Sequence, residues 1–102
     1  MNWKLICKLD DIPQLGSRVV QRQSGGDIAI FRTSDDEVFA MHDKCPHKGG
    51  PLSQGIVHGK RVTCPLHSWN IGLEDGQVVA PDVGSCETFK VKVENGEVFL
   101  AV

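Results

Sequence analysis

The sequence predicts an all-β fold, either an antiparallel sandwich or a small barrel. Short apolar runs rich in Val, Ile and Phe recur along the 102 residues, separated by clusters of Gly, Asp, Asn and Ser. Several runs alternate apolar and polar residues, which is the pattern of a strand with one buried face. No window of helical length carries an apolar stripe at 3.6-residue spacing. Short strands spaced in this way are typical of sandwiches and barrels.

The individual strands are expected between recognisable turn sequences. Ser34-Asp35-Asp36 and Asp75-Gly76 are two such turns, and each joins a pair of neighbouring strands. Residues 10–16 hold one helical turn at most. The expected strands ahead of the last hairpin cover residues 2–7, 17–22, 27–33, 37–43, 60–64, 69–74 and 77–80.

Residues 88–102 form the clearest predicted hairpin. Alternate residues of 89–93 are apolar and share one face, and the apolar residues of 98–102 return on the other arm. Asn95-Gly96 between them is the dipeptide that two-residue hairpin turns prefer. The prediction is one continuous two-stranded hairpin at the end of an antiparallel β domain that covers residues 1–102.

Charge and hydropathy exclude two classes of partner. The formal net charge is −2, so nothing favours binding to a nucleic acid. No apolar run approaches the roughly 18 residues of a membrane span. Lys4 and Lys8 interrupt the apolar N-terminal patch, which is unlike a signal peptide. We therefore expect a cytoplasmic protein, in which cysteines serve metal binding or catalysis before disulfides.

Two short motifs combine a cysteine with a histidine. Cys45-x-His47 is followed after sixteen residues by Cys64-x-x-His67, and each motif comes directly after an expected strand. A structural zinc site accepts two Cys and two His, although zinc fingers usually keep like ligands together in one turn. A cluster with four Cys would need cysteines far from the motifs. A [2Fe–2S] cluster with two Cys on one iron and two His on the other fits directly.

The motifs and the text around them resemble a known family. Cys-x-His, sixteen residues, Cys-x-x-His looks like the Rieske signature, and "HKGGPLSQG" and "LHSWNI" resemble the small subunit of assimilatory NAD(P)H-dependent nitrite reductase. The resemblance implies a Rieske-type β domain whose cluster-binding subdomain is formed by two hairpin loops, about residues 43–69. It implies a [2Fe–2S] cluster ligated by Cys45, His47, Cys64 and His67.

The same resemblance implies an oxidoreductase component in nitrate assimilation. A larger subunit with flavin, sirohaem and [4Fe–4S] would reduce nitrite to ammonium, and this chain would support electron transfer with no catalytic residue of its own. Two alternatives stay open. One is a free-standing Rieske ferredoxin for an aromatic-ring-hydroxylating dioxygenase, and the other is a non-redox structural or assembly subunit.

The residues around the motifs have expected supporting roles. Gly49, Gly50 and Gly55 are expected to adopt positive φ and bring backbone amides close to the cluster. Pro51 is expected to stiffen the first loop, and Trp69 to pack under the second loop and exclude water. The sequence has no Tyr and no additional cysteine in either motif. We therefore expect a reduction potential toward the negative end of the Rieske range.

Overall fold

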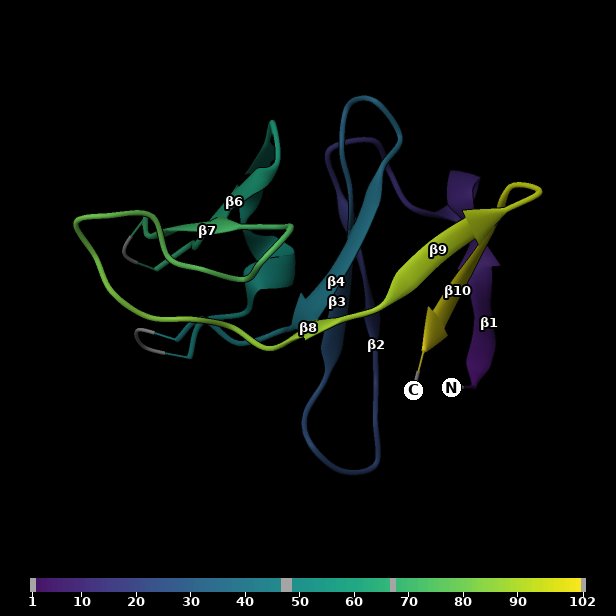
Figure 1. Ribbon diagram of the computed structural model, residues 1–102, viewed down its shortest axis with the longest axis horizontal. Helices are drawn as coiled ribbons and strands as arrows, with labels where there is room; N and C mark the ends of the chain where they lie inside the picture. Colours follow the sequence, from purple (N-terminus) through teal and green to yellow (C-terminus); the bar gives the residue numbers. More distant parts are fainter. Residues whose placement is uncertain (1, 47–48, 67, 102) are drawn as a thin grey trace.

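The computed structural model describes residues 2–46, 49–66 and 68–101, which form ten strands in three antiparallel sheets. The four-stranded sheet lies between the two three-stranded sheets (Figure 1). In chain order the strands are β1 (Trp3–Lys8), β2 (Ser17–Val20), β3 (Ile28–Arg32), β4 (Val38–His42), β5 (Ile56–His58), β6 (Arg61–Thr63), β7 (Asn70–Gly72), β8 (Thr88–Phe89), β9 (Val91–Glu94) and β10 (Glu97–Ala101). The antiparallel β prediction is confirmed.

The first sheet has the strand order β1-β10-β9. Its β9–β10 hairpin turns at Asn95 and Gly96, with φ angles of 52° and 75°. Two consecutive residues with positive φ are what a type I′ turn requires, so this predicted turn is confirmed. On β10, Val98 and Leu100 are fully buried, as the alternation predicts.

The central sheet has the order β2-β3-β4-β8, and β3 is buried on both faces. Ile28 and Ile30 point into a core shared with the first sheet, which also contains Val98 and Leu100. The alternate β3 residues Ala29 and Phe31 point into a second core on the opposite face. Because successive side chains of a strand face opposite ways, one strand supplies both cores.

The third sheet, β5-β6-β7, covers the second core. Val57, Val62 and Ile71 contribute one buried side chain from each of its strands. Both cysteines of the predicted metal motifs belong to the same core, together with Leu52 from a short 3-10 turn. The sheet therefore positions the motif region against the rest of the β scaffold.

Helical structure in the described part of the chain is limited to two 3-10 turns, η1 (Leu9–Asp11) and η2 (Leu52–Gln54). The first begins one residue before the range 10–16, where one helical turn was expected, and overlaps its first two residues. The second was not predicted from the sequence. Across the described ranges, no helix has the length and apolar character that crossing a membrane requires.

Two predictions about strands are wrong, and one strand was not predicted. Residues 88–94 are not one strand, because the chain changes sheets at Lys90: β8 pairs with β4, whereas β9 pairs with β10. Residues 77–80 form only isolated bridges, one of them between Ile71 and Val78. Residues 56–58 form β5, which was not predicted. Alternation shows which residues face the core, but it does not show which strand becomes the hydrogen-bonded neighbour.

Candidate metal centre

The first loop, residues 43–55, connects β4 to β5 and carries Cys45. The Cys45 amide donates a hydrogen bond to the Gly50 carbonyl oxygen (2.8 Å), and the Gly49 amide donates one to the Cys45 carbonyl oxygen (2.9 Å). Gly49 has φ +75°, which residues with a side chain rarely adopt. These bonds close a tight turn, at whose base Cys45 is only 2% exposed.

The second loop, residues 64–69, connects β6 to β7 and carries Cys64. The Cys64 amide donates to the Trp69 carbonyl oxygen (2.7 Å), and the Ser68 amide donates to the Cys64 carbonyl oxygen (3.1 Å). Ser68 has φ 59°, and Cys64 is also 2% exposed. This loop is therefore closed by main-chain bonds to its cysteine, as the first loop is.

The two loops share one hydrogen-bond pattern. In each, the cysteine amide bonds the carbonyl oxygen five residues later, and the cysteine carbonyl oxygen accepts from the amide four residues later. In each, the fourth residue after the cysteine has positive φ, and proline follows the cysteine directly. The two thiols thus occupy equivalent backbone settings, which suits two equivalent ligands of one inorganic centre.

The loops also contact each other. A methyl group added at Gly50 of the first loop would lie 2.8 Å from Leu66 Cγ and 3.4 Å from Cys64 Sγ of the second. Gly50 is buried, so no space remains there for a side chain. The absence of a side chain at Gly50 is what lets the first loop approach the second cysteine.

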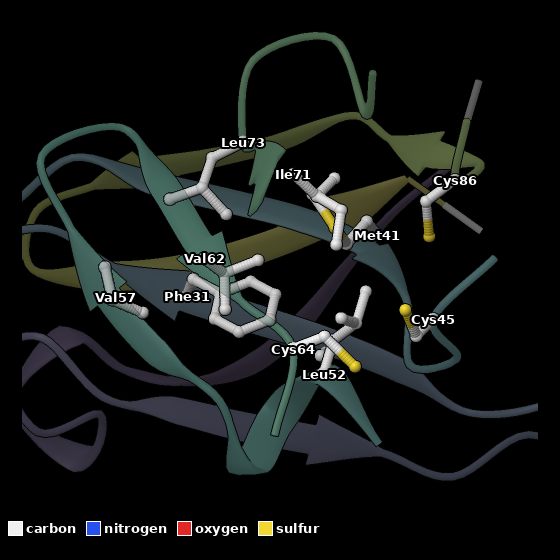
Figure 2. Close-up of a cluster of buried hydrophobic side chains, with 11 residues drawn as sticks. Phe31, Met41, Cys45, Leu52, Val57, Val62, Cys64, Ile71, Leu73 and Cys86 are labelled. Atoms are coloured by element: carbon white, nitrogen blue, oxygen red, sulfur yellow. The ribbon is translucent and has the colours of Figure 1, made fainter. Parts of the chain in front are cut away.

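Both motif thiols are in the core formed by the second and third sheets. Figure 2 shows the Cys45 and Cys64 sulfur atoms at one side of this core, beyond Phe31 and Leu52. Buried sulfur donors on two converging loops fit a group that must be shielded from water. Thiolate donors select soft metals and iron–sulfur clusters over hard cations.

A third cysteine, Cys86, lies in the same core and is drawn near Cys45 in Figure 2. Its thiol donates a hydrogen bond to the His42 carbonyl oxygen at 3.1 Å, and the Lys44 carbonyl oxygen lies at 3.7 Å. Burial, followed by the repulsion of Cys45, raises the pKa of Cys86 to about 11. Cys86 is buried, and its proximity to Cys45 could not be predicted because 41 positions separate the two residues in the sequence.

Two of the predicted ligands, His47 and His67, lie outside the described residues. Within the described ranges no group of three or more His, Cys, Asp or Glu is arranged to hold a metal ion. The structure therefore brings Cys45 and Cys64 into one core and leaves the histidine assignments as predictions. Of the remaining histidines, His58 is exposed on β5, where its Nε2 lies 2.7 Å from Thr63 Oγ1.

The predicted roles of the nearby residues are partly corrected. Gly49 has the expected positive φ, whereas Gly50 and Gly55 do not. Gly55 is needed because a side chain there would collide with the Thr63 carbonyl oxygen of β6. Pro51 is exposed and directly precedes η2, and Trp69 packs, half-buried, against the core that contains both cysteines. Close packing cannot be recognised from the sequence because it depends on which strand lies opposite.

The antiparallel β scaffold and the two matched, thiol-bearing loops place this protein in a class. It is a small β metalloprotein whose metal centre is held between two loops. The model of the Rieske [2Fe-2S] domain matches residues 2–90 of this sequence. The chain belongs to the Rieske [2Fe-2S] family. Its cofactor is accordingly a [2Fe–2S] cluster bound by two Cys and two His, and its general activity is electron transfer.

Similar proteins include a dioxygenase ferredoxin component, a nitrite reductase subunit and the oxygenase subunit of a demethylase. The ferredoxin component of naphthalene 1,2-dioxygenase/salicylate 5-hydroxylase systems from Ralstonia sp is 32% identical over 97% of this chain and 94% of that protein. The nitrite reductase [NAD(P)H] large subunit of Klebsiella oxytoca is 35% identical over 96% of this chain, which is 11% of that protein. The NMR structure of the E. coli protein NirD superposes with a TM-score of 0.82 at 30% identity, covering 97% of this chain and 94% of NirD.

Proposed function

We propose that this chain is the small, Rieske iron–sulfur subunit of an assimilatory NAD(P)H-dependent nitrite reductase. Cys45, His47, Cys64 and His67 would hold its [2Fe–2S] cluster, which supplies one-electron transfer when bound. The observation that carries the electron-transfer role is the matched pair of loops, which bury two thiols in equivalent settings at the edge of one core. The similarity to part of a nitrite reductase large subunit supports the reductase assignment.

The protein's own residues would separate the sulfur side of the centre from water. Cys45 and Cys64 are nearly inaccessible, and Trp69 packs beside them in the same core. Pro46 and Pro65, which follow the two cysteines, are exposed. Under this proposal His47 and His67 would be the remaining ligands, and the bound cluster would supply one-electron transfer to or from a docked partner. Nitrite would bind to the larger subunit.

A dioxygenase ferredoxin is the second candidate function. The Ralstonia ferredoxin component matches this chain along almost the whole of both proteins, as a free-standing carrier would. The text "CPLHSW" followed by "NIGLEDG" favours the reductase, because carrier ferredoxins more usually have a CPxHxxxFD ending. The two candidates share one cluster and differ in the partner that the chain binds.

Anaerobic purification from native cells, followed by electron paramagnetic resonance of the reduced protein, tests the proposal. We expect a Rieske spectrum and a sirohaem-bearing partner in the same complex. Co-purification with a dioxygenase would support the carrier instead. Zinc in place of iron would refute both. The proposed partner holds flavin, sirohaem and [4Fe–4S], and nitrite reduction by that complex should fall when this chain is removed.

A substitution at His47 separates electron transfer from a purely structural role. If the chain acts only in assembly, replacing His47 leaves nitrite reduction unchanged as long as the fold survives. If it acts as a relay, the Rieske signal and the electron transfer are lost together. Far-ultraviolet circular dichroism of the variant serves as the folding control.

The reduction potential gives a further test of the cluster environment. The chain contains no Tyr, so no tyrosine hydroxyl donates to a cluster sulfur. Since hydrogen bonds to sulfur raise the potential, we expect a value toward the negative end of the range of about −150 to +300 mV found for Rieske centres. A redox titration that gives a value near +300 mV would contradict this reasoning.

A further inference from the structure

Asp43 closes the base of the loop that carries Cys45. Its Oδ1 accepts a hydrogen bond from the Ser53 amide at 2.7 Å, and its Oδ2 accepts one from Ser53 Oγ at 2.8 Å. Both residues are half-buried and lie ten positions apart, on either side of the turn at Cys45. One carboxylate therefore joins the two ends of the loop by two charge-assisted hydrogen bonds, which are the stronger kind.

Both residues of this pair are tied to the four-stranded sheet. The Asp43 amide donates to the Asp27 carbonyl oxygen (2.9 Å), directly before β3. The Ser53 carbonyl oxygen accepts from Ser17 Oγ of β2 at 2.7 Å. Leu52, next to Ser53, is fully buried. The pair thus holds the loop ends to the sheet as well as to each other.

The second loop is closed in a different way. Its flanking residues Thr63 and Asn70 are directly paired in the β6–β7 ladder, and Thr63 Oγ1 also lies 2.6 Å from Asn70 Oδ1. The first loop has no such ladder in the described structure, because β4 and β5 belong to different sheets. It is therefore not the hairpin loop expected from the sequence. Asp43 supplies for the first loop the closure that strand pairing supplies for the second.

We propose that Asp43 is a positioning residue for the cluster, which sets where the Cys45 thiol lies relative to Cys64. This inference rests on the proposed assignment of both cysteines as ligands. The Cys86 thiol braces the neighbouring carbonyl oxygens of His42 and Lys44, so the loop keeps part of its support when the carboxylate is removed. Loss of Asp43 consequently loosens the first loop without unfolding the β scaffold.

The test compares variants by cluster retention, measured as the decay of visible absorbance after an iron chelator is added. Asp43→Ala leaves two half-buried Ser53 donors without an acceptor, and we expect cluster loss roughly 10- to 100-fold faster than in the wild type. Asp43→Asn keeps an oxygen acceptor for the Ser53 amide and should stay within about threefold of the wild type. Rescue by this variant distinguishes positioning from a general loss of stability.

Two matched controls accompany these variants. Thr63→Ala removes the corresponding side-chain contact of the second loop but leaves its strand pairing, so cluster loss should change by less than about threefold. Asp10→Ala deletes one exposed carboxylate away from the loops and should have no effect. Equal acceleration in Asp43→Ala and Asp10→Ala would overturn the proposal, as would unchanged retention in Asp43→Ala.

Amide hydrogen exchange supplies a readout that does not depend on the cluster. In Asp43→Ala the Ser53 amide should exchange faster, while the Cys64 amide, bonded to Trp69, keeps its protection. An unchanged Ser53 rate would refute the role of Asp43. If the wild type binds no iron, the proposed function fails, while this measurement still decides whether Asp43 closes the first loop. Should Asp43→Ala fail to fold, Ser53→Ala, which loses only the Oγ bond, takes its place.

Discussion

Replacing Gly50 by alanine should force the two cluster loops apart. The added methyl carbon would lie 2.8 Å from both Cγ and Cδ1 of Leu66, and 3.4 Å from Cys64 Sγ. Non-bonded carbon atoms are most stable at about 3.5–4.0 Å. Leu66 Cγ is close to its own main chain, so rotation of the side-chain tip alone does not relieve the contact. To relieve the contact, Leu66 must adopt another χ1 rotamer or the second loop must withdraw by about 1 Å.

The cost of this displacement follows from overpacking. Extra methylene groups in a packed site typically cost about 1–3 kcal/mol. Each 1.4 kcal/mol corresponds to a factor of ten in an equilibrium, so the closed arrangement of the loops would be disfavoured by roughly 5- to 150-fold. We expect Gly50→Ala to contain less iron and acid-labile sulfide per protein than the wild type, and to lose its cluster faster to a chelator.

A second substitution tests the assigned cause. Leu66→Ala removes the two carbon atoms that would collide, so the Gly50→Ala/Leu66→Ala double variant should recover most of the lost iron. Leu66 is 53% exposed, and Leu66→Ala alone should change stability by no more than about 0.5 kcal/mol. Wild-type iron content in Gly50→Ala, or a double variant that recovers nothing, would refute the account of the loop contact.

Three other predictions follow from packing and burial. Phe31→Ala should lower the free energy of unfolding by about 3–5 kcal/mol in urea denaturation, because Phe31 is fully buried in the core beside the loops; a loss below 1 kcal/mol would contradict this. Gly55→Ala should lower Tm by roughly 10 °C, since its methyl group would collide with the Thr63 carbonyl oxygen. Ile56 is 70% exposed, so Ile56→Ala is the control for Phe31→Ala and Gly55→Ala and should have the stability of the wild type. Because the pKa of Cys86 is raised to about 11, only roughly one thiol in a thousand is ionised at pH 8. Alkylation of Cys86, measured by mass spectrometry, should therefore be slow at pH 8 and should accelerate as the pH approaches 11. Alkylation at pH 8 as fast as in the unfolded protein would contradict the burial of the thiol.

Much of the β architecture can be predicted from local sequence signals. The turn at Asn95-Gly96 has the predicted positive φ angles, and the Ser34-Asp35-Asp36 turn joins β3 to β4 as expected. Alternation also identifies Val98 and Leu100 as core residues. These predictions succeed because turn conformation and side-chain direction depend on residues that are adjacent in the chain.

Contacts between distant segments are less accessible to sequence analysis. Alternation continues through Lys90 although the chain changes sheets there, because Phe89 and Val91 both pack against the same core. The closure of the first loop by Asp43 and Ser53 likewise carries no recognisable spacing. In each case the deciding interaction joins segments whose approach depends on the whole fold.

The sequence by itself determined the β class, the principal turns and the pairing of one cysteine with one histidine in each motif, because each of these is encoded by neighbouring residues. The tertiary structure alone decided that Cys45 and Cys64 share one core, that Gly50 must lack a side chain and that a carboxylate replaces strand pairing at the first loop. The physical reason is that these features arise from close packing between sheets, where a difference of about 1 Å decides whether two groups bond or collide.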